Sequence, residues 1–365
     1  MCNDRNFPAL TRMRAVVLLF LAAACGGGEP RDRPAGETPA AEAGSPGREL
    51  AYVTNEGSGE LTVIDVASDS VVSSIAVGTR PRGLRVSEDG KTVYVALSGS
   101  PRCPPTMPDE ECEKLKADKS KDGIGVVDVA SRKVTRVLPG GSDPETFDIS
   151  RDGTRLFVSN EDAHVATIVD IQSGKILATV PVGREPEGVE LHPSGGTVWI
   201  TGETDHNVTV LHTDSGRVVS KIAVGKRPRD LAFSPDGSRA YVTSEIDGTV
   251  AVVDAKSYKV TDTIKLPAGS KPMGVEFSTD GSRAYVANGR GGTVSVIDTR
   301  SDSVVATIED IGTRPWGIAL TDGGKLYTAN GPSGNVTVVD TEKLVVLKKI
   351  PTGELPWGVV VGRAP

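Results

Sequence analysis

Short apolar runs separated by polar turns fill most of the chain. The first runs lie at residues 52–55, 61–65, 71–77 and 83–86, with turns at 56–59 and 88–90. Short runs rich in Val, Ile and Thr, bounded by Gly, Ser and Asp, are typical of β-strands joined as hairpins. The pattern therefore predicts a unit of four short antiparallel strands.

Three landmarks show that this unit is repeated. An aromatic residue opens the second strand at Tyr52, Tyr94, Phe157, Trp199, Tyr241, Tyr285 and Tyr327. The third strand closes at Asp65, Asp128, Asp170, His212, Asp254, Asp298 and Asp340. A proline precedes the innermost strand at Pro81, Pro144, Pro186, Pro228, Pro272, Pro315 and Pro356. Neighbouring copies are about 42 residues apart, with one step of 63 residues, and each series has seven members. A period of about 40–45 residues with four strands is typical of a propeller blade. The sequence thus predicts an all-β fold, a seven-bladed β-propeller of four-stranded antiparallel blades.

The ends of the repeat array predict how the ring closes. The array begins with the second strand of a unit, at Tyr52, whereas residues 356–361 match only the innermost strand. We expect one blade to combine this C-terminal innermost strand with three N-terminal strands. Such a closure removes the free edges that an open ring of sheets would leave.

Composition limits the possible partners. Apolar residues make up 38% of the chain and aromatic residues 4%, so the core must consist mainly of Val, Ile and Ala packed between blades. The net charge is −7 with both signs mixed throughout, which argues against a general nucleic-acid binder. We expect a monomer.

The N-terminal region resembles an export signal. Arg14 precedes an apolar run at 15–24 and then Cys25. The run is too short to span a bilayer but suits a signal-peptide core. The residues before Cys25 resemble a bacterial lipoprotein box, although Ala22 stands where leucine is usual; a simple cleaved signal is the alternative. Met13 is a possible true start.

These features divide the chain into a lipoprotein-type signal peptide at 1–25, a Gly/Pro/Ala/Glu-rich disordered tether at 26–49, and the propeller at 50–365. We expect a protein anchored through Cys25 in the cell envelope, facing the periplasm or the outer surface. Gly26 is not the aspartate associated with inner-membrane retention, which favours the outer membrane. The lipid anchor would be the sole membrane contact.

One copy of the repeat carries an insertion, at residues 98–122. It contains Cys103 and Cys112, which we expect to form a disulfide in an oxidising envelope. The cysteines lack Cys-x-x-Cys spacing, so a thiol redox motif or haem attachment is not indicated. A metal or redox site is the alternative to a stapled loop.

The residue after each ring proline should stand near the mouth of the central channel. These residues are Arg82, Glu145, Glu187, Arg229, Met273, Trp316 and Trp357. An aromatic wall beside cations and anions suits a small-molecule funnel. Alternatively, the arginines only neutralise the glutamates and the tryptophans plug the channel. Under the first alternative these seven residues form a ligand-binding site, and the sequence leaves both alternatives open.

Further candidates come from the adjacent hairpin ends. They are Asn160, Glu161, Glu203, Glu245, Asn288 and Asn330, several of which could instead be turn caps. His164 and His206 lie in corresponding turns of neighbouring blades and are weak metal-ligand candidates, because no carboxylate–histidine motif supports them. The sequence predicts no metal and no cofactor.

The motif Tyr52-Val53-Thr54-Asn55 and its copies resemble the YVTN family of β-propeller repeats from Leu50 to Val361. Several short sequence motifs resemble those of periplasmic propellers associated with pyrroloquinoline-quinone-dependent alcohol catabolism. These are RPRG at 80–83, DPE at 143–145, NED at 160–162, EPEG at 185–188, RPR at 227–229 and PWG at 356–358. The resemblance implies an envelope accessory role; the lipoprotein signal and the cysteine insertion depart from that group.

Together these observations favour a non-catalytic, envelope-tethered binding or scaffolding propeller that recognises a small molecule or an envelope protein at the channel mouth. No nucleophile elbow or phosphate loop occurs in the sequence. The alternative is a lactonase- or lyase-like propeller enzyme, or a cofactor- or metal-carrying accessory protein of periplasmic oxidative metabolism.

Overall fold

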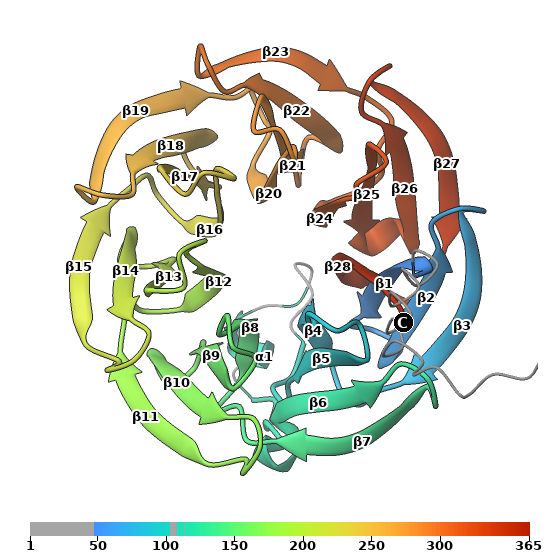
Figure 1. Ribbon diagram of the computed structural model, residues 1–365, viewed down its shortest axis with the longest axis vertical. Coiled ribbons are helices and arrows are strands. Elements are labelled where there is room, and N and C mark those ends of the chain that lie inside the picture. The colour runs from blue at the N-terminus through green and yellow to red at the C-terminus, as the bar shows by residue number, and fades with distance from the viewer. Residues whose placement is uncertain (1–46, 103–106, 108, 113) are drawn as a thin grey trace, which may run out of the picture. The chain divides into compact units, whose positions relative to one another are not determined.

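Seven sheets are arranged in a ring like the blades of a propeller (Figure 1), and their innermost strands line a central channel. The computed structural model describes residues 47–102, 107, 109–112 and 114–365, with the side chains of Asp109 and Cys112 excepted. All seven sheets have four antiparallel strands, so the predicted fold class is confirmed. The predicted signal peptide, the predicted lipidation site Cys25 and nearly all of the predicted tether lie outside the described residues.

The strands of each blade are given from the channel outward. Blade 1 consists of β28 (Pro356–Arg363), β1 (Glu49–Asn55), β2 (Glu60–Asp65) and β3 (Ser70–Ala76). Blade 2 consists of β4 (Pro81–Val86), β5 (Thr92–Leu97), β6 (Gly123–Asp128) and β7 (Lys133–Leu138). Blade 3 consists of β8 (Pro144–Ile149), β9 (Arg155–Asn160), β10 (Val165–Asp170) and β11 (Ile176–Pro181). Blade 4 consists of β12 (Pro186–Leu191), β13 (Thr197–Gly202), β14 (Asn207–His212) and β15 (Val218–Ala223).

The remaining three blades follow the same order. Blade 5 consists of β16 (Pro228–Phe233), β17 (Arg239–Ser244), β18 (Thr249–Asp254) and β19 (Lys259–Lys265). Blade 6 consists of β20 (Pro272–Phe277), β21 (Arg283–Asn288), β22 (Thr293–Asp298) and β23 (Ser303–Ile308). Blade 7 consists of β24 (Pro315–Leu320), β25 (Lys325–Asn330), β26 (Asn335–Asp340) and β27 (Val345–Pro351), with the short 3₁₀-helix η2 (Gly331–Ser333) between β25 and β26.

Blade 1 closes the ring as predicted. The C-terminal strand β28 pairs with β1, and Ala51 lies opposite Val361 in the antiparallel register. The first and last described parts of the propeller therefore share one sheet, and the ring has no break between its first and last repeats.

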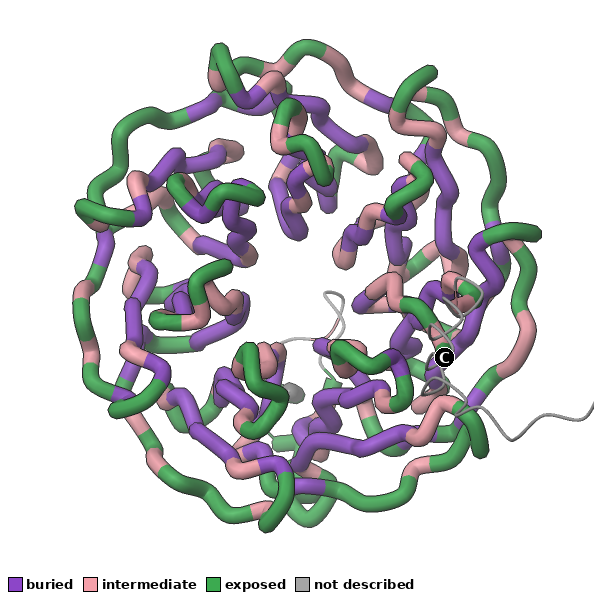
Figure 2. Tube along the Cα trace, viewed as in Figure 1, coloured by how far each residue is buried: buried purple, intermediate pink, exposed green. Residues whose placement is uncertain are grey.

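The core lies between neighbouring blades. One cluster packs Tyr52 and Val63 of blade 1 against Leu84 and Val93 of blade 2. Burial is greatest in the three inner strands of each blade, while the outermost strands are largely exposed (Figure 2). The prediction that aliphatic residues stacked between blades supply the core is in accord with this distribution.

The insertion in blade 2 leaves β5 and returns to β6. Its described parts include α1 (Asp109–Cys112) and η1 (Lys119–Lys121). Asp122 fastens its end, accepting hydrogen bonds from the backbone N–H groups of Gly99 (2.6 Å) and Asp143 (3.0 Å). Cys103 and the side chain of Cys112 lie outside the described residues, so their disulfide stays a prediction. The structure contains, in its described part, no helix of the length and apolar character needed to span a membrane.

Candidate functional site

The channel mouth is shaped by an unusual backbone at the start of every innermost strand. The residue before each ring proline has a positive φ, between 43° and 59°. These residues are Arg80, Asp143, Glu185, Arg227, Lys271, Arg314 and Leu355. A non-glycine residue in this region is strained, and the position before proline adds to the restriction. Because all seven blades share it, the strain belongs to the architecture of the innermost strands.

Arg82 organises one half of the mouth. It is buried and pairs with Glu145 of the next blade. Its guanidinium also lies 3.3 Å from a carboxylate oxygen of Glu56 and 3.4 Å from one of Glu161. Burial raises the pKa of Glu161 to about 7, although the charge of Arg82 opposes this.

Arg229 organises the other half. It is buried, pairs with Glu187 and Glu203, and its Nε lies 2.8 Å from Glu245. Burial raises the pKa of Glu187 well above its usual value against the pull of Arg229. Burial also raises the pKa of Glu203, but the hydrogen bond with Glu187 and the arginine charges outweigh it, so that pKa is lowered. Of these two carboxyls, Glu187 therefore takes up a proton first.

Two tryptophans form an aromatic wall beside these clusters. The ring centroids of Trp316 and Trp357 are 5.5 Å apart and their planes are inclined by 34°. The guanidinium carbon of Arg229 lies 5.3 Å from the centroid of Trp316, and that of Arg314 lies 4.9 Å from it. Both indole rings are half-buried, so each keeps a surface free for contact.

A cavity of about 440 Å³ opens between the two arginine clusters and this wall. Its charged lining consists of Glu56, Arg80, Arg82, Arg102, Glu145, Glu161, Glu187, Arg227, Arg229 and Arg314. Six of the seven residues expected at the mouth line it, Met273 being the exception. The arginines thus pair with the glutamates, and a cavity with an aromatic wall remains beside them, while ligand binding there stays a prediction.

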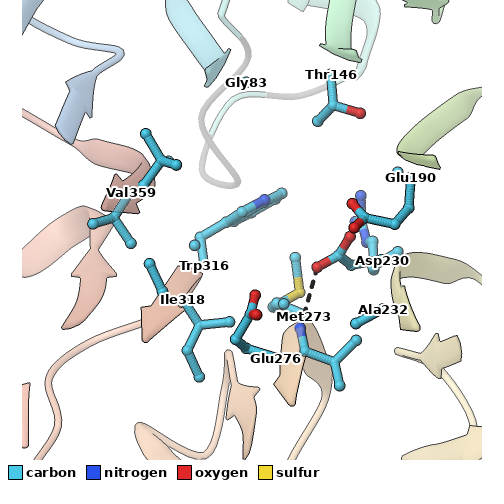
Figure 3. Close-up of a pocket in the computed structure, with 18 of the residues that line it drawn as sticks. Gly83, Thr146, Glu190, Asp230, Ala232, Met273, Glu276, Trp316, Ile318 and Val359 are labelled. Carbon is cyan, nitrogen blue, oxygen red and sulfur yellow. Dashed lines mark hydrogen bonds between the residues drawn. The ribbon is translucent and has the colours of Figure 1, made fainter. Parts of the chain in front are cut away.

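A second chamber of about 230 Å³ lies deeper in the channel, and Figure 3 shows side chains from several blades converging on it. Met273 lies here, with 2% of its surface exposed. A second charged layer also lines the channel at this level. Arg85 links blades 2, 3 and 4, its Nε lying 3.3 Å from Asp148 and its Nη2 2.9 Å from Glu190.

Two further acids line the chamber, Asp230 and Glu276, and their charges also act on Arg85. Burial raises the pKa of Asp230 to about 6, although Asp230 accepts a hydrogen bond from the backbone N–H of Val275. Burial and the neighbouring Asp230 raise the pKa of Glu276 to about 7. Sequence reasoning missed this layer, although the fourth residue after the ring proline is charged in blades 2, 3, 4 and 6.

The three predicted asparagines do not line the mouth cavity. Each is fully buried at the end of a second strand. Their amide nitrogens donate to a hydroxyl on the third strand of the same blade: Asn160 to Thr167, Asn288 to Ser295 and Asn330 to Thr337. They hold hairpins together. Of the glutamates predicted with them, Glu161 lines the cavity, whereas Glu203 and Glu245 support Arg229.

His164 and His206 occupy turn positions with φ of 58° and 54°, where blades 1, 5, 6 and 7 have glycine. Nδ1 of His164 accepts a hydrogen bond from the backbone N–H of Glu185 (3.3 Å). Nδ1 of His206 lies 2.7 Å from the carbonyl of Glu203. Both side chains contact backbone and neither lines the mouth cavity, so their geometry suits a local role in the turn.

One group of carboxylates in the described part of the chain is close enough to share a cation. Oxygens of Asp143, Glu145 and Glu161 lie within 4.8 Å of one another. Arg82, however, contacts all three carboxylates and pairs directly with Glu145. The guanidinium thus already supplies the positive charge that a metal ion would bring.

The fold and the lined channel define the class of protein, a seven-bladed β-propeller. Two family models match parts of the chain: "Lactonase, 7-bladed beta-propeller" over residues 216–343 and "YNCE-like beta-propeller" over residues 109–194. A 53-residue segment is 42% identical to the uncharacterised protein YncE of Salmonella typhi and of Salmonella typhimurium. That segment covers 14% of this chain and 15% of the length of each relative.

Several solved structures share the fold over most of the chain. A functionally unknown protein from Desulfotomaculum acetoxidans is 18% identical, with a TM-score of 0.71, and the match covers 87% of this chain and 99% of that one. A Bacteroides fragilis protein named as a candidate 6-phosphogluconolactonase is 16% identical, with a TM-score of 0.70 and coverage of 89% and 100%. Kuenenia stuttgartiensis hydrazine synthase is 21% identical, with a TM-score of 0.65 and coverage of 77% and 89%. At these identities the likeness concerns the fold alone.

Proposed function

We propose that this chain is a non-catalytic binding propeller that holds a small molecule in its mouth cavity. The observation that carries the proposal is the wall formed by Trp316 and Trp357 on a cavity of about 440 Å³. This volume falls within the range of about 300–1,000 Å³ that is usual for ligand pockets. The buried carboxylates nearby are engaged by Arg82 and Arg229, which leaves them poorly placed to act as nucleophiles.

A thermal-shift screen against a library of small metabolites tests this function. Hits should raise the melting temperature of the wild type and leave that of the double variant Trp316→Ala/Trp357→Ala unchanged, because the wall is lost. The control is Val305→Ala/Leu347→Ala, which removes two exposed apolar side chains from outer strands and should respond like the wild type. Equal shifts in the wild type and the tryptophan variant would rule the cavity out as the binding site.

A lactonase is the second candidate. It is supported by the partial match to the lactonase family model and by Glu161, which lines the cavity with a pKa raised to about 7 by burial. A carboxyl that titrates near neutral pH is suited to general acid–base catalysis. Turnover of 6-phosphogluconolactone that is lost in Glu161→Gln would favour this function over the binding function; we expect no turnover.

We further propose that the propeller is held at the cell envelope by a lipid on Cys25, and that it serves as an accessory protein of periplasmic oxidative metabolism. The signal-like residues before Cys25 and the resemblance of the repeat wording support this proposal. Incorporation of labelled fatty acid into the wild type, but not into Cys25→Ser, would be the expected result. An envelope protein that co-purifies with the chain and depends on the mouth residues would point to scaffolding instead.

A further inference from the structure

We propose that the mouth cavity selects small organic anions with a flat apolar body, and that Arg314 binds the anionic group. The inference rests on the proposed function, because it names the class of molecule that the same cavity takes. It follows from the way charges are paired around the cavity and from the position of Arg314 on the aromatic wall.

The arginines that line the cavity differ in whether a carboxylate engages them. Arg80 lies 2.8 Å from Glu56, and Arg227 lies 2.6 Å from Glu203. Arg82 and Arg229 are the centres of the two clusters described above. Arg314, in contrast, has no carboxylate within 4.0 Å among the residues that the structure describes. Arg102 is exposed and adjoins residues outside the described part of the chain.

Arg314 is nevertheless held in place. It precedes the ring proline Pro315 with a φ of 55°, so its backbone is fixed by the architecture of the mouth. Its guanidinium lies over the ring of Trp316, and the residue is half-buried. A positioned guanidinium presents a planar fork of N–H donors, which matches the two oxygens of a carboxylate. Preorganisation of this kind reduces the entropy lost on binding.

The surroundings of Arg314 favour an anion. Burial lowers the pKa of Arg314, and the positive charges of Arg229, Arg290 and Arg227 lower it further, against the opposing effect of Glu245. An arginine remains protonated at neutral pH even so. A bound carboxylate would offset this repulsion, whereas a cation would add to it.

The glutamates of the mouth do not reverse this preference. Glu56, Glu145 and Glu187 are each paired with an arginine, so their charge is largely neutralised. Glu161 is also close to an arginine, and its raised pKa leaves part of the population uncharged at neutral pH. The free surface beside Arg314 is the indole pair, which accommodates a flat apolar body.

Two probes of nearly the same shape separate charge from stacking: indole-3-acetate, an anion, and indole-3-acetamide, which is neutral. Isothermal titration calorimetry with the full chain should show at least tenfold tighter binding of the acetate. Arg314→Gln should reduce the acetate affinity at least tenfold and leave the acetamide affinity unchanged. Arg314→Lys should retain part of the preference, because it keeps the charge but not the fork.

The matched control is Arg290→Gln. Arg290 is an exposed arginine close enough to influence Arg314, and it does not line the cavity. It should change the acetate affinity by less than twofold. Melting temperatures of the variants within a few degrees of the wild type establish that each is folded.

The outcomes distinguish a failure of the anion preference from a failure of the proposed binding function. Equal affinity for both probes, with binding lost in Trp316→Ala/Trp357→Ala, would overturn the anion preference and leave the binding function intact. An Arg314→Gln variant that keeps the preference would also overturn it. If neither probe binds the wild type, selection of flat anions is wrong, and the metabolite screen alone decides whether the cavity binds another class of molecule.

Discussion

In two blades the tyrosine in the interior of the second strand also connects that blade to the next one. The hydroxyl of Tyr327 in blade 7 donates a hydrogen bond of 2.5 Å to Asp69 in the outer turn of blade 1. Tyr241 in blade 5 donates in the same way to Asp302 of blade 6. In blade 1 the hydroxyl of Tyr52 is buried without a partner, because Arg132 of blade 2 occupies the turn position that Asp69 and Asp302 hold in blades 1 and 6.

This difference predicts opposite results for the same substitution. Tyr327→Phe removes a hydrogen bond to a charged group and should lower the free energy of unfolding by about 1.5–3 kcal/mol. Tyr52→Phe removes an unsatisfied buried hydroxyl and should leave stability unchanged or raise it by less than about 1 kcal/mol. Urea denaturation of the two single variants measures both values. Equal losses would show that the Asp69 contact contributes little.

At the scale of single residues the sequence predicted positions better than contacts. Arg82, Arg229, Trp316 and Trp357 could be placed at the mouth because each follows a ring proline. The role of Asn160 could not be predicted, since its position in the repeat does not say whether its amide faces the cavity or the adjacent strand. That choice depends on where Thr167 places its hydroxyl, which only the folded hairpin determines.

Among the elements, the seven innermost strands carry the candidate function. Each has a register irregularity near its start, as between Pro81 and Leu84 in β4. A bulge of this kind breaks the strict alternation of side chains along a strand. The ring prolines therefore sufficed to predict which residues lie at the mouth. The second charged layer lies beyond the bulge, so the usual alternation of side chains between the two faces of a strand could not predict it.

That second layer should make stability depend on pH. In the folded protein burial raises the pKa of Glu276 from 4.5 to about 7. Between these values the folded state binds more protons than the unfolded chain, so the free energy of unfolding falls as pH rises. Glu276→Gln, which mimics the protonated form, should stabilise the protein at pH 8 by about 1–2 kcal/mol after allowance for water in the channel. Near pH 4 the variant and the wild type should be alike.

Chemical denaturation at pH 4, 6 and 8 measures this dependence. Glu342→Gln serves as the control, because Glu342 lies exposed on an outer turn, and its stability should follow the wild type at every pH. A Glu276→Gln profile parallel to the wild type would mean that the channel keeps this carboxyl fully hydrated.

For the molecule as a whole, the fold was predictable because three landmark series kept the same phase through seven copies. Blade 1, which combines the C-terminal strand with three N-terminal strands, was also predictable. The repeat array begins with the second strand of a unit and ends with an innermost strand. The identity of a ligand could not be predicted, because proteins of this fold carry out many different chemistries and differ in the side chains at the site. Lipidation at Cys25 and the Cys103–Cys112 disulfide stay predictions.

Because β28 closes the ring, the stability of the fold should depend on this one strand. Deletion of residues 356–365 removes Trp357 and Val359 and leaves the inner edge of β1 unpaired. We expect such a chain to lose its cooperative thermal transition and to aggregate, because an exposed strand edge pairs with other chains. Deletion of Pro365 alone should leave the transition unchanged. Calorimetry and size-exclusion chromatography provide the comparison, and a monomeric, cooperatively melting deletion variant would contradict the expectation.

Blade 1 also bears on how the protein is made. During synthesis β1, β2 and β3 emerge first, but their sheet lacks its innermost strand until residues 356–363 have been produced. The strands synthesised first therefore cannot complete their blade until β28 has been synthesised. Until β28 is made, the nascent chain keeps an unpaired edge at β1, and we expect chaperones to reach that edge.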